Sequence, residues 1–241
     1  MKNETLIEYF YILPFSGETR SKPFITAFFF LIYVVGVLIN SSIITVICLE
    51  VQLHKPMYLF ICNLSIVDIF YTSVTVPKLL HMLLSGNHIV SSAQCYTQFY
   101  FFIVNLSMED ILLFVMACDR YVAICKPLHY HQILSRRNCS LITIGIWVVA
   151  FSNALLFMTS ALYMTSCHSN LIHQFFCDIK SLTKTSCRRV TGYIIPDYAE
   201  VLSSMFHVIY TTITPMINPI IYSIQNSSVQ AALLRLFRRM Y

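Results

Sequence analysis

The chain has 241 residues, of which 57% are apolar and only 11% charged, whereas soluble domains carry about 25% charged residues. This composition excludes disorder, collagen-like repeats and a solvated coiled coil, because 11 acidic and 16 basic side chains could not cover a soluble surface. The net charge of +5 requires no nucleic acid, since lysine and arginine form no dense run and basic residues commonly flank membrane spans. We expect an integral membrane protein whose partner is the lipid bilayer.

Five long apolar segments follow one another along the chain. A spanning helix needs about 20 largely apolar residues, whereas the strands of a membrane barrel alternate over about 10 residues. We therefore predict an all-α membrane bundle. Its helices are expected at about 24–49, 57–80, 95–121, 140–164 and 199–224.

The orientation of the chain in the membrane is not decided by charge, because the 16 lysines and arginines divide equally between the two sides. Asn3 begins an Asn-Glu-Thr sequon, which is glycosylated only outside the cytosol. Four loop cysteines on the same side suit an oxidising compartment: Cys95, Cys167, Cys177 and Cys187. Four cysteines allow three pairings, and the sequence does not choose among them. We expect 1–23 and 165–198 to be extracellular and the C-terminus to be cytosolic.

Three acids lie within predicted helices: Asp68 in the second, and Glu109 and Asp110 in the third. A carboxylate inside the bilayer costs a few kcal/mol and usually faces a partner or water. Neighbouring helical residues point about 100° apart, so only one of Glu109 and Asp110 faces Asp68 easily. Two interpretations stay open. The acids form a small chamber for water, protons or Na⁺, or they are protonated carboxyls that only fix helix packing.

An acid and a base stand side by side near the inner end of the third predicted helix. Asp119 and Arg120 lie at the edge of the hydrocarbon, where an acid beside a base neutralises its field. Such a pair works as a switch, which is closed while the two are paired and opens when Arg120 finds another partner. With Tyr121 they form the tripeptide Asp-Arg-Tyr, which is a weak signal when taken alone.

The last predicted helix contains two prolines in the stretch 215–222. Pro215 and Pro219 each remove a backbone donor and free a carbonyl group. The side chain of Asn218 can satisfy part of this break, and Tyr222 ends the stretch. We predict a polar hinge inside the membrane.

The tail at 226–241 is a separate element. Its apolar residues recur at helical spacing with arginines between them, as in a short helix that lies on a membrane surface. The apolar set is Val229, Leu233, Leu236, Phe237 and Met240, and the basic set is Arg235, Arg238 and Arg239. We predict a cytoplasmic amphipathic helix, with a frayed tail as the alternative.

Signals of catalysis are absent from the sequence. The 5 glycines are scattered, so no phosphate-binding loop can form, and the 8 histidines are spread singly. HExxH, CxxC and nucleophile-elbow motifs do not occur. We expect no enzyme and no cofactor, and no metal site beyond the Na⁺ alternative above.

Several long strings, in the same order, connect the chain with a known family. They are Leu-His-Lys-Pro-Met-Tyr-Leu-Phe at 53–60, Asn-Leu-Ser at 63–65 with Asp68, the stretch 116–130, Phe-Cys-Asp at 176–178, and the stretch 214–223. Together they resemble the olfactory (odorant) receptors, a family of rhodopsin-like G-protein-coupled receptors. Cys118 is a mild departure, because the family usually has tyrosine there.

The resemblance has one large gap. Only eleven residues separate Cys187 from Ala199, where the family has its fifth helix, third cytoplasmic loop and sixth helix. A helix rises 1.5 Å per residue, so eleven residues cannot cross a bilayer once. We expect five of the seven helices, an even deletion that keeps the C-terminus in the cytosol. A real deletion and an omitted exon would give the same sequence.

The resemblance also implies roles for single residues. It implies the disulfides Cys95–Cys177 and Cys167–Cys187, a G-protein-coupling switch of Asp119, Arg120 and Tyr121, and a polar network of Asp68, Glu109 and Asn218 that holds Na⁺ in one interpretation. It places an apolar odorant pocket at Ile103, Leu106, Ser107 and Met108, with His207 near the outer end of the last helix. Ile103 stands where many relatives carry histidine, and plain helix packing or lipid contact is the alternative role for the apolar residues.

Three functions follow from these observations. The resemblance implies a plasma-membrane receptor that binds small odorants and couples to a heterotrimeric G protein. Because the family's fifth and sixth helices supply a pocket wall and the moving lever, the alternative is a truncated, non-signalling product, retained in the endoplasmic reticulum or acting through intact receptors. A more remote alternative is a small ion or proton channel that uses Asp68, Glu109 and Asp110.

Overall fold

The computed structural model describes residues 8–12, 22–164, 171–172, 176–177, 218 and 227–240. The chain divides into two compact units. The first unit contains 1–33, 73–103 and 153–212, and the second contains 34–72, 104–152 and 213–241. The long helices contribute one segment to each unit, and each unit is described by itself.

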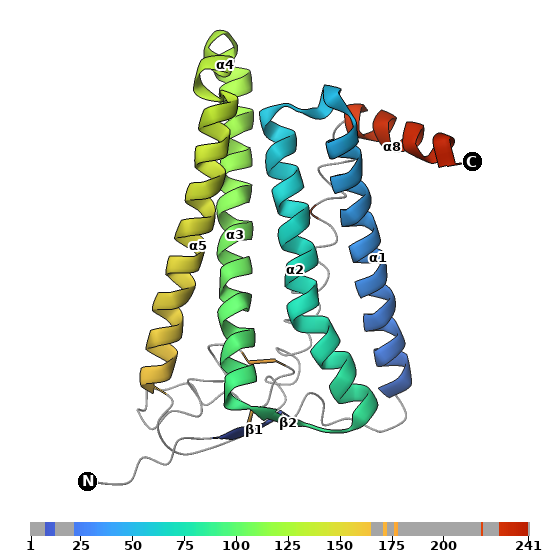
Figure 1. Ribbon diagram of the computed structural model, residues 1–241, viewed down its shortest axis with the longest axis vertical. Helices are drawn as coiled ribbons and strands as arrows, with labels where there is room; N and C mark the ends of the chain where they lie inside the picture. The colour runs from blue at the N-terminus through green and yellow to red at the C-terminus, as the bar shows by residue number, and fades with distance from the viewer. Residues whose placement is uncertain are drawn as a thin grey trace. The chain divides into compact units, whose positions relative to one another are not determined.

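Four helices of the described ranges are long and apolar enough to cross a membrane. They are α1 (Lys22–Leu49), α2 (Pro56–Ser85), α3 (Ser92–Cys125) and α5 (Arg136–Met164) (Figure 1). The prediction of a membrane helical bundle is confirmed, with four of the five expected spans. The fifth, expected at 199–224, lies outside the described residues except for Asn218.

The helices begin and end at local signals that extend them beyond the apolar runs. α2 contains Pro77 and continues past the expected end at 80 to Ser85. The next residue, Gly86, has a positive φ of 66° and donates its N–H to the Met82 carbonyl at 3.1 Å, which forms a left-handed cap. Ser91 and Ser135 cap α3 and α5, since their hydroxyls accept the N–H groups of the third residue of each helix at 3.3 Å. α3 ends at Cys125, two residues before Pro127.

The first unit contains a small sheet that the all-α prediction missed. Strand β1 (Tyr9–Ile12) lies between β2 (Ile89–Ser91), to which it is antiparallel, and β3 (Leu171–Ile172), to which it is parallel. β1 and β2 are labelled in Figure 1. Phe10 and Ile12 of β1 are buried, and the Phe10 ring meets Tyr96 of α3 edge-on with centroids 6.3 Å apart. Strands of two to four residues are too short for a periodic signal.

The second unit adds short elements and the tail helix. The 3-10 helix η2 (Val51–Leu53) joins α1 to α2, and η3 (Pro127–His129) with α4 (Tyr130–Ile133) joins α3 to α5. Helix α8 (Ser227–Met240) runs crosswise to the segment of α1 in this unit (Figure 1). Val229 and Ala232 of α8 are buried while Leu234 is exposed, as expected for an amphipathic helix.

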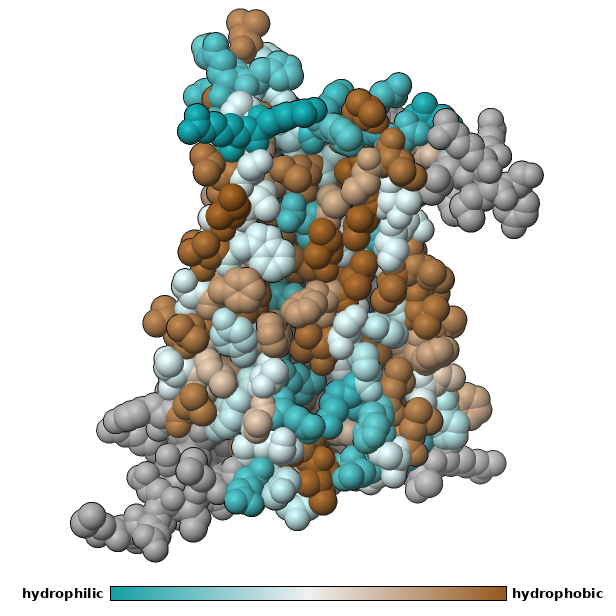
Figure 2. Space-filling model, in the orientation of Figure 1, coloured by the Kyte–Doolittle hydropathy of each residue, from teal (hydrophilic) through white to brown (hydrophobic). Residues whose placement is uncertain are grey.

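The outer surfaces of the spanning helices are apolar. The most apolar window of α2 is 61% buried, whereas that of α5 is only 17% buried. Large apolar side chains such as Leu31 of α1 and Leu156 of α5 are exposed, and apolar groups cover much of the helix sides in Figure 2. Lipid is the natural contact for such surfaces, because exposed apolar areas of this extent are rare in soluble monomers.

Candidate functional sites

A buried polar cluster lies in the second unit. Asp68 of α2 is 1% exposed and Glu109 of α3 is 8% exposed, and the two carboxyl groups are close enough to interact electrostatically. The Asn218 side chain donates a hydrogen bond from Nδ2 to Glu109 Oε1 at 2.5 Å. The cluster thus joins α2, α3 and the segment predicted as a hinge, and it contains all three residues of the predicted polar network.

Of the two neighbouring acids of α3, only one lies in the buried cluster. Glu109 faces this cluster, while Asp110, one residue along, is exposed. The difference follows from the rotation of about 100° between successive helical residues. The chamber interpretation therefore applies to Asp68 and Glu109 only.

The cluster contains oxygen atoms that suit a hard cation. Both carboxyl oxygens of Asp68 and the hydroxyl of Ser65, one helical turn earlier, are buried without a hydrogen-bond partner in the described part. Leaving such atoms unpaired is costly, and hard cations prefer oxygen ligands. The donor set therefore fits Na⁺. No group of three or more His, Cys, Asp or Glu side chains in the described ranges could hold a metal ion, so a transition-metal site has no support there.

A second site lies at the end of α3. Asp119 is 2% exposed, and its Oδ1 accepts a hydrogen bond from the Tyr130 hydroxyl at 2.8 Å. Arg120 and Tyr121, the next two residues, are exposed. Asp119 is therefore hydrogen-bonded to Tyr130 as well as lying in the field of Arg120, and the side chain of Arg120 is exposed at the helix end.

Tyr130 is a functional candidate that sequence reasoning missed. The break at Lys126 and Pro127 starts η3, and α4 then presents Tyr130 to α3. Burial raises the pKa of Tyr130, and the hydrogen bond to the Asp119 carboxylate raises it further, so the hydroxyl remains a donor at physiological pH. The string that carried the family resemblance included this tyrosine, but nothing in its spacing indicated the contact with Asp119.

A disulfide holds the first unit together. Cys95, near the start of α3, is bonded to Cys177, with Cα atoms 5.4 Å apart and a sequence separation of 82. Both cysteines are fully buried, and the nearby rings of Phe102 and Phe176 lie 4.8 Å apart. This pairing is the one that the resemblance implied.

The residues of α3 that were predicted to contact a ligand differ in burial. The side chains of Ile103 and Met108 are buried, and those of Leu106 and Ser107 are partly buried. A set of predicted residues lies outside the described ranges: Asn3, Cys167, Cys187, His207, Pro215, Pro219 and Tyr222. Their roles stay predictions.

A pocket between α2 and α3 in the first unit, with some polar side chains in its wall, was also missed. Pro77 interrupts the hydrogen bonds of α2, and Gln98 of α3 donates from Nε2 to the Val74 carbonyl, one turn before this proline, at 3.1 Å. The pocket has a volume of about 450 Å³, and Lys78 and Gln94 also line it. A proline inside an apolar helix was the signal that could have directed attention to Gln98.

Comparison with known proteins gives the family. The model of the 7 transmembrane receptor (rhodopsin family) matches residues 39–197. Olfactory receptor 12D1 of Homo sapiens is 33% identical over 306 residues, covering 99% of this chain and 96% of its own. Olfactory receptor 1A1 of Pan troglodytes is 32% identical over 294 residues, covering 95% of both chains.

This chain is shorter than these relatives by about the length of the two helices that the sequence was predicted to lack. Olfactory receptor 12D2 of Homo sapiens is 32% identical over 307 residues, covering 100% of both chains. Since this chain has 241 residues against those 307, at least 66 aligned positions have no residue here. That is roughly two spanning helices and a connecting loop. The chain is therefore a shortened, multi-pass membrane member of the olfactory receptors, a family of receptors rather than enzymes within the rhodopsin-type seven-transmembrane proteins.

Proposed function

We propose that this chain is an odorant receptor of the plasma membrane, with its N-terminus outside, that engages a heterotrimeric G protein at the inner end of α3. One observation carries the proposal: Asp119 is buried and bonded to Tyr130, which leaves the adjacent Arg120 exposed. A guanidinium offers five donors in a fixed plane and stays charged at all physiological pH values. It is suited to bind backbone carbonyls or a carboxylate of a partner protein.

The buried cluster supplies the second part of the proposed mechanism. Asn218 lies in the predicted hinge, and its hydrogen bond to Glu109 links that hinge to α3. Na⁺ held by Asp68 and Ser65 would neutralise the charge next to this link. Rearrangement of the hinge would change the Asn218–Glu109 contact and, through α3, the position of Arg120.

The proposed ligand is a small, mainly apolar molecule. It would contact α3 at Ile103, Leu106, Ser107 and Met108, with His207 as the polar contact from the last helix. Outside the membrane, the proposed second disulfide Cys167–Cys187 and a glycan on Asn3 would complete the extracellular surface. These assignments rest on family membership and on the burial of Ile103 and Met108.

The shortened chain favours a second candidate function. At least 66 positions of a relative have no counterpart here, and the most apolar window of α5 is only 17% buried. A chain that exposes so much apolar helix surface would be retained in the endoplasmic reticulum or would act by pairing with intact receptors. This candidate predicts membrane insertion without odorant-driven signalling.

One experiment separates the two candidates. The chain, carrying an extracellular epitope tag, is expressed in cells with an olfactory G protein, and cyclic AMP is measured with odorant mixtures alongside surface labelling. Cyclic AMP that rises with odorant, and is lost in Arg120→Ala but kept in Arg137→Ala, supports the receptor. Arg137 is the control because it is an exposed arginine at the start of α5.

The opposite result is equally defined. No cyclic AMP, no surface label and a high-mannose glycan on Asn3 would support the non-signalling candidate. Sequencing the transcript across the codons for 186–198 then shows whether the gap exists in the messenger RNA. An in-frame insert encoding two more helices would remove the second candidate altogether.

A further inference from the structure

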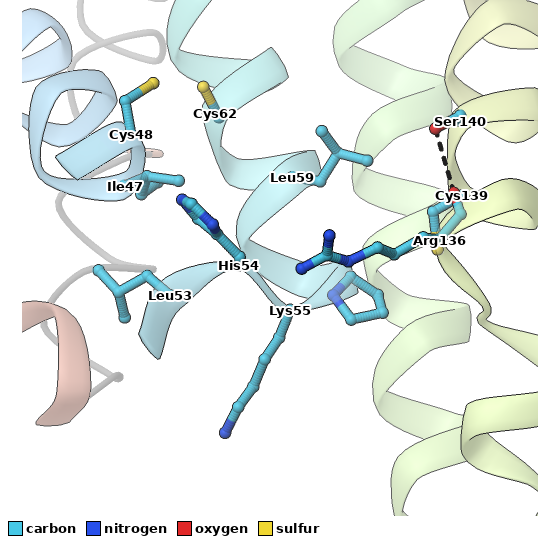
Figure 3. A pocket seen from close by; sticks show the side chains of 11 residues that line it. Ile47, Cys48, Leu53, His54, Lys55, Leu59, Cys62, Arg136, Cys139 and Ser140 are labelled. Carbon is cyan, nitrogen blue, oxygen red and sulfur yellow. Dashed lines mark hydrogen bonds between the residues drawn. The ribbon is translucent and has the colours of Figure 1, made fainter. Parts of the chain in front are cut away.

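A pocket of about 340 Å³ lies in the second unit, and one of its lining residues, Cys139, is close enough to Asp119 and Tyr130 to interact with them electrostatically. Its lining comes from the end of α1, the start of α2 and the first residues of α5 (Figure 3). A volume above about 300 Å³ is sufficient for a small-molecule or headgroup site. The pocket has therefore room for more than a few water molecules.

The lining combines positive charge with apolar walls. Arg136 and Lys55 contribute two cations, His54 adds an imidazole, and no Asp or Glu is among the described residues of the lining. In Figure 3 the guanidinium of Arg136 points toward His54. Ile47 and Leu59 give aliphatic surface, and three thiols complete the wall: Cys48, Cys62 and Cys139. An anionic head with an apolar body would match both parts.

The position of the pocket along the helices indicates the source of such a ligand. α1 ends at Leu49, α2 begins at Pro56 and α5 begins at Arg136, so the pocket lies where three membrane-spanning helices leave the hydrocarbon. Lipid headgroups lie at this level. Leu59 is 37% exposed and Cys48 is exposed, so the apolar wall continues onto the lipid-facing side.

We propose that this pocket binds one anionic phospholipid of the adjoining leaflet. The lipid phosphate lies against Arg136 and His54, with the flexible Lys55 closing over it, and an acyl chain follows Ile47 and Leu59. With the N-terminus outside, this leaflet is the cytoplasmic one, which carries the anionic lipids of the cell. The site does not depend on odorant binding or on G-protein coupling.

The thiols of the wall provide a direct reporter. Cys48 is exposed and lines the pocket, so a bound lipid would cover it. Cys125 of α3 is also exposed but does not line the pocket. The unmodified full chain is placed in phosphatidylcholine vesicles, with or without added phosphatidylinositol bisphosphate, and N-ethylmaleimide labelling of each cysteine is followed by peptide mass spectrometry.

The expected result is a roughly fivefold slower labelling of Cys48 with the anionic lipid and an unchanged rate at Cys125, since one cation near a charged surface changes binding by about that factor. Arg136→Gln should remove most of this protection. Arg137→Gln, which removes the same charge one residue away and outside the lining, should retain it. Inorganic phosphate, added to the phosphatidylcholine vesicles in place of the anionic lipid, should protect neither cysteine.

The outcomes that overturn the proposal are equally specific. Equal rates at Cys48 in both vesicles would exclude occupancy of the pocket, and this test needs no variant that could fail to fold. Equal loss of protection in Arg136→Gln and Arg137→Gln would show attraction by overall charge, not a site. Protection of Cys48 by inorganic phosphate alone would assign the pocket to a soluble anion and not to a phospholipid.

Discussion

The bonds that stabilise the first compact unit differ in kind from those that stabilise the second. In the first, a disulfide fixes Cys95 to Cys177, and backbone hydrogen bonds join three short strands. In the second, single side-chain hydrogen bonds tie buried polar groups, as between Asn218 and Glu109. Covalent and backbone bonds depend little on neighbouring side chains and do not exchange readily. Side-chain bonds can exchange partners, so the second unit is the one that is suited to switching.

The largest expected effect comes from removing the disulfide. Cys95→Ala should lower the free energy of unfolding by about 2–5 kcal/mol, because the cross-link restricts the unfolded chain. The measurement is chemical unfolding in detergent, followed by circular dichroism. Cys118→Ala is the matched control, since Cys118 is an exposed free cysteine of the same helix. Equal stability of the two variants would show that the cross-link does not hold the first unit.

The next effect tests the buried cluster. Asn218→Ala should cost about 1–3 kcal/mol, because it leaves a buried Glu109 oxygen without its donor. A double-mutant cycle with Glu109→Ala isolates the pair, and its coupling energy should account for most of the loss. Asp110→Asn is the control, since Asp110 is exposed. A coupling energy near zero would place the stabilisation elsewhere.

The Asp119–Tyr130 bond should contribute less. Tyr130→Phe removes the donor and should cost about 1 kcal/mol, while Tyr121→Phe, at a 60% exposed position, should be neutral. The single tryptophan, Trp147 of α5, lies in the same unit and reports unfolding by its fluorescence. If both variants unfold like the parent chain, the bond has no stabilising role.

The same bond predicts a pH dependence. The folded pKa of Tyr130 is raised above its ordinary value, so its contribution is complete below the unfolded pKa of about 10 and is lost as the pH rises beyond it. The stability difference between the parent chain and Tyr130→Phe should therefore stay constant through neutral pH and shrink only in strong alkali. A difference that already shrinks near neutral pH would mean that Tyr130 is not buried against Asp119.

Comparison of the units also shows what the sequence could predict. Long apolar helices were predictable, because the thickness of the bilayer imposes a minimum length that composition alone reveals. The predicted ends fell short, since capping residues such as Ser91 and Ser135 lie outside the apolar runs. The sheet gave no signal, because its strands are too short for a period to appear.

Pairwise contacts were less predictable than elements. The rotation between neighbouring helical residues indicated that only one of Glu109 and Asp110 would face Asp68, but which one depends on how α3 is turned toward α2. Tyr130 was missed because its contact with Asp119 depends on the path of η3 and α4. Family resemblance supplied the Cys95–Cys177 pairing, which spacing left open among three connectivities.

The smallest effect concerns a polar contact between two helices of the first unit, which resembles the side-chain hydrogen bonds of the second unit. Gln98→Met keeps the length of the side chain but removes the donor to the Val74 carbonyl, which should cost about 0.5–1.5 kcal/mol. Gln94→Met is the control, because Gln94 is exposed one turn earlier on α3. Unfolding curves of the two variants in detergent give the difference. If Gln98→Met is as stable as Gln94→Met, the Pro77 region of α2 does not depend on this bond, and the contrast between the two units is sharpened. If Gln98→Met is less stable, the first unit also depends on a side-chain bond that can exchange partners, beside its pocket between α2 and α3. The division between a fixed unit and a switching unit then becomes one of degree.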